Sequence, residues 1–238
     1  SHRAIRTDNV FFSIDSKKFI FGECISAPPG MNNPAVFEEV DRQLCNPFLR
    51  GNGNTLSDCY SFGVVLVSML NGGVPHLNTN HFDLANMKSE KGSFVTLMMF
   101  NALSNYAGKE ILQGLLHDDP KIRWGISDIK EWMQGFSKIK NFVHKSNKTT
   151  PLKIFNQKIV SVKQFIIFVI KNWKKCENEL EVKKIKDWIN KNFSDKIFSE
   201  KINLLFHTAG HLVTSKNGLN NFMISAICCY INSAAGPI

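Results

Sequence analysis

The chain has 238 residues, of which 43% are hydrophobic and 21% charged, and its formal net charge is +9. Length and composition suffice for one large or two modest packed domains. The longest apolar run, Phe165 to Ile170, is too short to span a bilayer, and no charged-then-apolar leader is visible, so the sequence predicts a cytoplasmic chain without a membrane span.

The predicted elements of the first part of the chain start with a small β-hairpin, formed by residues 9–15 and 17–21. The clearest helix covers residues 55–70. The segment Thr55 to Asp58 has capping-box spacing at its start, and Asn71-Gly72-Gly73 ends it. Its apolar residues fall on every face, which predicts a central buried helix.

Further along the chain the pattern is almost entirely helical. We expect helices at about 106–117 and 127–135, the second capped by Ser127, with Pro120 breaking the helix in the loop between them. After a linker at residues 141–151, four more helices are predicted. They lie near residues 161–173, 180–189, 197–205 and 222–231, with Ser161 as the first cap and Gly210 as a stop in the third.

The charge pattern supports a division into two regions. Residues 1–144 hold 14 Lys and Arg against 14 Asp and Glu, whereas residues 145–203 hold 14 Lys against 6 acidic residues. Such a break predicts regions with different partners. We therefore predict a mainly α chain with a first domain at 1–140 and a basic helical domain at 152–238.

Five motifs occur in the order in which protein kinases carry them. His2-Arg-Ala-Ile-Arg-Thr-Asp-Asn9 has the spacing of the catalytic loop H-R-D-L-x-x-x-N. Gly22-Glu-Cys-Ile25 stands where D-F-G is usual, and Pro34-Ala-Val-Phe-Glu38 is similar to A-P-E. Ser57-Asp-Cys-Tyr-Ser-Phe-Gly63 and Asp119-Pro-Lys-Ile-Arg-Trp124 complete the set.

Residues 1–135 therefore resemble the C-terminal lobe of a protein kinase, a small hairpin plus helices around a central buried helix. The closest resemblance is to a bacterial group with Gly-Glu-Cys in place of D-F-G, in which a helical region follows. The resemblance implies that Asp58 accepts backbone N–H bonds from the catalytic loop, and that Glu38 and Arg123 form a buried ion pair. Gly63 is expected to allow a close approach inside the lobe.

The resemblance also implies a defect in catalysis. Ala4 stands where a kinase has its catalytic Asp, and a methyl group cannot accept a proton. His2, Arg3 and Arg6 are remnants of the catalytic loop, with Arg6 in place of the usual Lys.

Binding of Mg-ATP stays open at this point. Asn9 and Glu23 are candidates to hold it, although Glu23 is one methylene longer than the usual Asp. No glycine-rich loop and no V-A-I-K strand precede His2 in the sequence. Because the first residue is Ser1 rather than Met, we expect an excerpt or a processed product, in which case an N-lobe would belong to the intact parent protein.

Three functions remain open. The favoured one is a pseudokinase without a cofactor in this chain, which serves as a binding, scaffolding or regulatory module for a protein partner. The second is an active or atypical ATP-dependent serine/threonine-type kinase in the intact parent, using Asn9 and Glu23. The third is binding of nucleic acid or another anionic partner by the stretch 145–203, although solvated helix faces explain its lysines more simply.

Metal ligands and thiols give weaker signals. His207 and His211 lie four residues apart, which suits a metal ion on a helix, but no carboxylate lies between them and Gly210 weakens the helix. The six cysteines form no C-x-x-C pair, which favours buried thiols in a reducing compartment. Cys228 and Cys229 are expected to be buried on an apolar helix.

Overall fold

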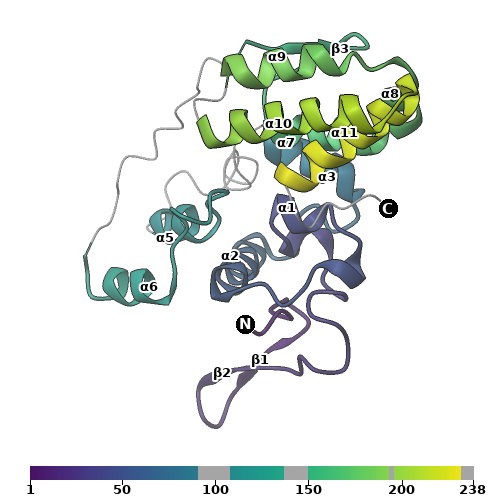
Figure 1. The fold of residues 1–238 in the computed structure, drawn as a ribbon. Helices are drawn as coiled ribbons and strands as arrows, with labels where there is room; N and C mark the ends of the chain where they lie inside the picture. The colour runs from purple at the N-terminus through teal and green to yellow at the C-terminus, as the bar shows by residue number, and fades with distance from the viewer. Residues whose placement is uncertain (91–107, 137–149, 193–195, 232–238) are drawn as a thin grey trace. The chain divides into compact units, whose positions relative to one another are not determined.

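The computed structural model describes residues 1–90, 108–136, 150–192 and 196–231. It is mainly helical, and the strands of the described residues form two separate two-stranded sheets (Figure 1). The chain divides into two compact units, unit 1 at residues 1–144 and unit 2 at residues 145–238. The predicted linker lies outside the described residues as far as residue 149.

Unit 1 starts with an antiparallel hairpin of β1 and β2, as predicted. Its strands are β1 (Val10–Ser13) and β2 (Lys18–Phe21), and its helices are η1 (Ala35–Phe37), α1 (Val40–Gln43), η2 (Pro47–Leu49), α2 (Thr55–Asn71), α3 (His81–Glu90), α5 (Lys109–Leu115) and α6 (Ile126–Met133). The helices α2, α5 and α6 match predicted ones, whereas α3 was not predicted from the sequence.

Helix α2 is the centre of unit 1, which confirms the expected buried helix. Tyr60, Val64, Val65 and Val67 are almost fully buried in one apolar cluster. A Cβ on Gly63 would lie 2.9 Å from the side chain of Leu116, so a glycine is needed where α5 and the residue after it approach α2. Different parts of unit 1 therefore cover most apolar residues of α2, whereas Met69 and Leu70 near its C-terminal end are exposed.

Two of the predicted helix caps are wrong. The N-cap of α2 is Asn54 rather than Thr55, and its side chain accepts a hydrogen bond from the N–H of Ser57. The N-cap of α6 is Gly125 rather than Ser127, because the carboxylate of Asp128 accepts the Gly125 N–H at 2.8 Å. Each error is one or two residues, the usual uncertainty of a helix end.

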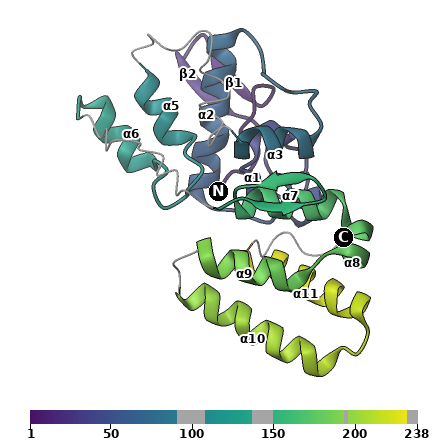
Figure 2. The ribbon, with the colours of Figure 1, turned by 90° about the horizontal axis from the view of Figure 1, so that it is seen from above.

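Unit 2 is a helical layer with a small hairpin that was not predicted. Its elements are β3 (Leu152–Ile154), β4 (Gln157–Ile159), α7 (Val162–Lys171), α8 (Trp173–Glu179), α9 (Val182–Asn192), α10 (Lys196–Leu212) and α11 (Lys216–Ile231). Ser161 caps α7 as predicted, whereas Gly210 does not end α10. Helices α9, α10 and α11 run side by side (Figure 2).

Phe165, Phe168 and Trp188 belong to the core of unit 2, whereas Trp173 is half-buried and Phe222 is exposed. Phe165 and Trp188 are buried with their rings 6.3 Å apart, and the indole N–H of Trp188 donates to the backbone oxygen of Thr150. They therefore pack the unit, as expected from their helical spacing. Among the described residues, no helix has both the length and the apolar character needed to cross a membrane.

Candidate functional site

The N-terminus of α2 fixes the turn formed by residues 2–9. The buried carboxylate of Asp58 accepts hydrogen bonds from the backbone N–H groups of His2 at 2.5 Å and Arg3 at 2.8 Å. A negative charge is favoured there because the free N–H groups of the first helical turn point toward it. These are the bonds that the resemblance implies for Asp58, and the structure contains them.

The turn is closed onto the end of the β1–β2 hairpin by His2. The Nδ1 atom of His2 accepts the N–H of Ala4 at 3.3 Å, which leaves Nε2 to carry the proton and donate to the backbone oxygen of Gly22 at 3.1 Å. The imidazole ring also lies against Phe21, with ring centroids 5.5 Å apart. His2 therefore connects the turn to the segment that follows β2.

Asn9 makes the second connection. Its Nδ2 atom donates to the backbone oxygens of Ala4 at 2.8 Å and Glu23 at 2.9 Å, and its own backbone oxygen accepts the N–H of Gly22. A Cβ on Gly22 would lie 1.9 Å from Oδ1 of Asn9. Only glycine fits at position 22 while Asn9 keeps this orientation.

Glu23 is exposed, and its carboxylate is turned toward the residues that follow it. One oxygen accepts the N–H groups of Ile25 and Ser26, and the other accepts the hydroxyl of Ser26. The hydrogen bond from the Ser26 side chain, followed by those from the two N–H groups, lowers the pKa of Glu23. To bind Mg²⁺ together with Asn9, Glu23 would have to exchange these hydrogen bonds for metal coordination.

A small pocket beside the turn brings together four residues singled out from the sequence, namely Arg3, Ala4, Arg6 and Glu23. Its volume of about 20 Å³ is enough for one water molecule. Ligand pockets are typically about 300–1,000 Å³, so this space does not hold a nucleotide as it stands. Arg6 instead pairs with Asp8 at 2.7 Å on the surface.

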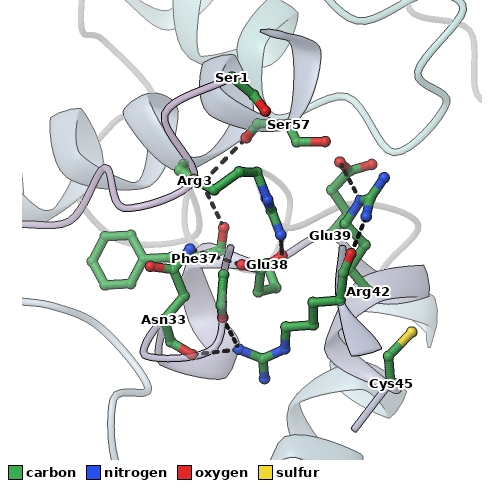
Figure 3. Close-up of polar contacts among 12 residues, drawn as sticks. Ser1, Arg3, Asn33, Phe37, Glu38, Glu39, Arg42, Cys45 and Ser57 are labelled. Atoms are coloured by element: carbon green, nitrogen blue, oxygen red, sulfur yellow. Dashed lines mark hydrogen bonds and ion pairs between the residues drawn. The ribbon is translucent and has the colours of Figure 1, made fainter. Parts of the chain in front are cut away.

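The prediction of an ion pair between Glu38 and Arg123 is wrong. Glu38 pairs with Arg3 at 2.8 Å, and Arg123 pairs with the neighbouring Glu39 at 2.9 Å. The backbone is extended at both glutamates, so their side chains point in opposite directions (Figure 3). The resemblance thus implied the correct arginine but the wrong one of two adjacent carboxylates.

The Arg123 guanidinium joins several parts of unit 1. Besides Glu39, it donates to the backbone oxygens of His117 at 2.8 Å and Leu56 at 3.3 Å, and it lies 5.1 Å from the ring centroid of Tyr60. Burial raises the pKa of Glu39, but Arg123 and a hydrogen bond from Ser57 outweigh it, so the net pKa is lowered. Glu39 is therefore held as a carboxylate at neutral pH.

Around Glu38 lies a buried polar cluster that the sequence did not reveal. The second carboxylate oxygen of Glu38 accepts the amide of Asn33 at 2.7 Å, and Arg50 donates to the backbone oxygens of Gly30 and Asn33. Gly30 has a φ of 74°, the left-handed region that glycine tolerates best. No motif marks these two residues, because Asn33 meets a side chain five residues away and Arg50 meets backbone oxygens distant in sequence.

Lys88 of α3 is a second residue that sequence reasoning missed. Its side chain is fully buried, and Nζ donates to the backbone oxygen of Glu38 at 2.9 Å while lying 5.3 Å from the Tyr60 ring centroid. Burial lowers its pKa to about 7, against the opposing effect of Asp118, Glu38 and Glu39. The sequence did not predict α3, so no signal suggested a buried lysine there.

The remaining candidate metal ligands and three of the thiols lie on α10, on α11 and in the segment after β2. His207 and His211 lie on α10, Cys228 is buried and Cys229 half-buried on α11, and Cys24 is exposed. Within the residues that the structure describes, no group of three or more His, Cys, Asp and Glu could hold a metal ion.

No protein-family model matches the sequence, and neither a curated protein nor a solved structure matches it significantly.

Proposed function

We propose that this chain is a kinase-like pseudoenzyme that serves as a binding, scaffolding or regulatory module for protein partners. The observation that carries the proposal is the position of Ala4. The turn is held over α2 by Asp58 and joined to the segment after β2 by Asn9, and Ala4, which follows the residues bound by Asp58, has only a methyl group. A phosphotransferase needs a carboxylate at such a point to orient the acceptor hydroxyl.

Three groups that build the turn make contacts that do not depend on catalysis. Asp58, His2 and Asn9 are engaged by backbone groups of unit 1, and these contacts stabilise the fold whether or not phosphate is transferred. Loss of a general base typically reduces a rate by about 10²–10⁴. A turn that keeps its structural contacts but has no general base at Ala4 favours a binding role over catalysis.

The exposed apolar side chains of the β1–β2 hairpin support the proposal of a protein partner. Five of its large apolar side chains are 47–61% exposed: Phe11, Phe12, Phe19, Ile20 and Phe21. Because Phe11 pairs with Ile20 and Phe12 with Phe19 in register, these side chains lie on both faces. Contiguous exposed apolar surface of this kind marks interaction sites.

Two other functions have weaker support. An atypical ATP-dependent transfer would use Asn9 and the ionised Glu23, and the lowered pKa of Glu23 favours that reading because a metal needs the carboxylate. Binding of an anionic polymer would use exposed lysines such as Lys183 and Lys184 on α9. That helix buries Ile185 and Trp188 on its other side, which is the ordinary pattern of a solvated amphipathic helix.

Thermal unfolding with and without Mg-ATP tests the proposal. A ligand that binds only the folded state at about 100 times its Kd adds about 2.7 kcal/mol of stability, so binding would raise the Tm visibly. We expect no change in Tm. A rise that is lost in both N9A and E23A would contradict the proposal and favour the ATP-dependent alternative.

A further inference from the structure

His207 and His211 lie one helical turn apart near the end of α10. Both side chains are exposed, and their ring centroids are 4.7 Å apart with an angle of 63° between the ring planes. Residues four apart on a helix lie on the same face, one above the other. The two imidazoles are therefore neighbours on an open surface of unit 2.

Helix α10 continues through the residue that was expected to end it. Gly210 is helical, the helix extends to Leu212, and the N–H of Val213 still bonds to the backbone oxygen of Ala209 at 3.0 Å. Gly210 therefore does not interrupt the helix between the two histidines. The pair is carried by a continuous turn of helix.

The other side of α10 holds this turn in place. Ile202 and Ala209 are fully buried and lie seven residues apart on one face of the helix, which contacts α9 and α11 within unit 2. With 3.6 residues per turn, His207 and His211 fall on roughly the opposite side. The packing of α10 thus fixes the helix face that carries the two imidazoles, and this face is exposed to solvent.

We propose that His207 and His211 form a two-histidine chelate for a divalent transition-metal ion such as Ni²⁺, Cu²⁺ or Zn²⁺. Imidazole nitrogen suits these ions, and a pair fixed on one helical face loses less freedom on binding than two independent side chains would. Since no third protein ligand stands with the pair among the described residues, the other coordination positions belong to water or an external donor. This class of site is open rather than structural.

Calorimetric titration of the whole chain with Ni²⁺ tests the chelate. The double variant H207N/H211N supplies the background from all other ligands, including the exposed thiol of Cys24. We expect the wild type to show one additional site, and H207N and H211N each to weaken it by at least about tenfold. Circular dichroism should show the same helical content in all variants, since both side chains are exposed.

G210A is the matched control, because a Cβ at this position meets nothing within 4 Å. It should keep the wild-type affinity for Ni²⁺ or increase it slightly, since alanine favours the helix that carries the pair. The proposal is overturned if the double variant binds Ni²⁺ as the wild type does. It is equally overturned if either single variant keeps the wild-type affinity, because one imidazole would then suffice.

Discussion

The guanidinium of Arg3 and the carboxylate of Glu38 lie 2.8 Å apart, with only 2% and 0% of their side chains exposed. Arg3 belongs to the turn at the start of the chain, whereas Glu38 follows the short helix η1. The pair therefore ties the turn formed by residues 2–9 to a distant segment of unit 1. Each charge depends on the other because water does not reach either one.

Replacing Glu38 by alanine should strongly destabilise unit 1. E38A leaves the Arg3 charge buried without its partner, which typically costs about 3–5 kcal/mol. Hydrogen exchange of the backbone amides in α2 measures this loss for unit 1 alone. The matched control is D8A, which removes the exposed partner of Arg6 and should change stability by less than about 1 kcal/mol. Equal effects of the two variants would contradict the account.

Asp58 gives a graded prediction. D58A removes both acceptors for the N–H groups of His2 and Arg3, and each buried donor left without a partner costs about 1–3 kcal/mol. D58N keeps one acceptor oxygen, so its effect should be smaller. Urea unfolding should rank the three proteins as wild type, D58N and D58A in order of decreasing stability, and a D58A protein as stable as the wild type would refute the role of Asp58.

Gly22 tests the close contact with Asn9. In G22A the new methyl group must displace Asn9, which breaks the bonds from Asn9 to Ala4 and Glu23 and should cost about 1–3 kcal/mol. G73A is the control, since a Cβ there meets nothing within 4 Å. Thermal unfolding should show a lower Tm for G22A only.

Lys88 predicts a dependence of stability on pH. Its folded-state pKa of about 7 lies below the ordinary 10.5, so between these values the unfolded chain binds a proton that the folded chain does not. Stability should therefore rise with pH across this window, by on the order of 2 kcal/mol from about pH 6.5 to about pH 8.5. The measurement stops there because buried thiols such as Cys45, with a pKa raised to about 11, act in the opposite direction at higher pH.

The variant K88M isolates this contribution. It has no titratable group at position 88, so the difference in free energy of unfolding between wild type and K88M should change with pH, whereas that of K88M alone should be flatter. Hydrogen exchange of the α2 amides at about pH 6.5 and about pH 8.5 gives the free energy of unfolding of unit 1 in the wild type and in K88M. A pH dependence identical in the two proteins would show that Lys88 is not buried in its neutral form.

The sequence predicted those parts of the structure that rest on local patterns. The apolar residues on all faces of residues 55–70 predicted a central helix. The hydrogen bonds of Asp58 to the turn were implied by the resemblance to protein kinases and not by a local pattern. Pairings between distant segments were harder. Glu38 and Glu39 are adjacent and chemically alike, so only the extended backbone at both residues decides which one meets Arg123. Lys88 and Arg50 were missed because burial of a charge depends on tertiary packing.

We propose that the turn around Ala4 is a structural framework without phosphotransfer activity. Incubation of the chain with γ-labelled ATP, Mg²⁺ and a general protein substrate tests it directly, with N9A and E23A in parallel. We predict no label on the chain or on the substrate in any of the three proteins. Labelled phosphate that appears with the wild type and is abolished in N9A or E23A would contradict the account.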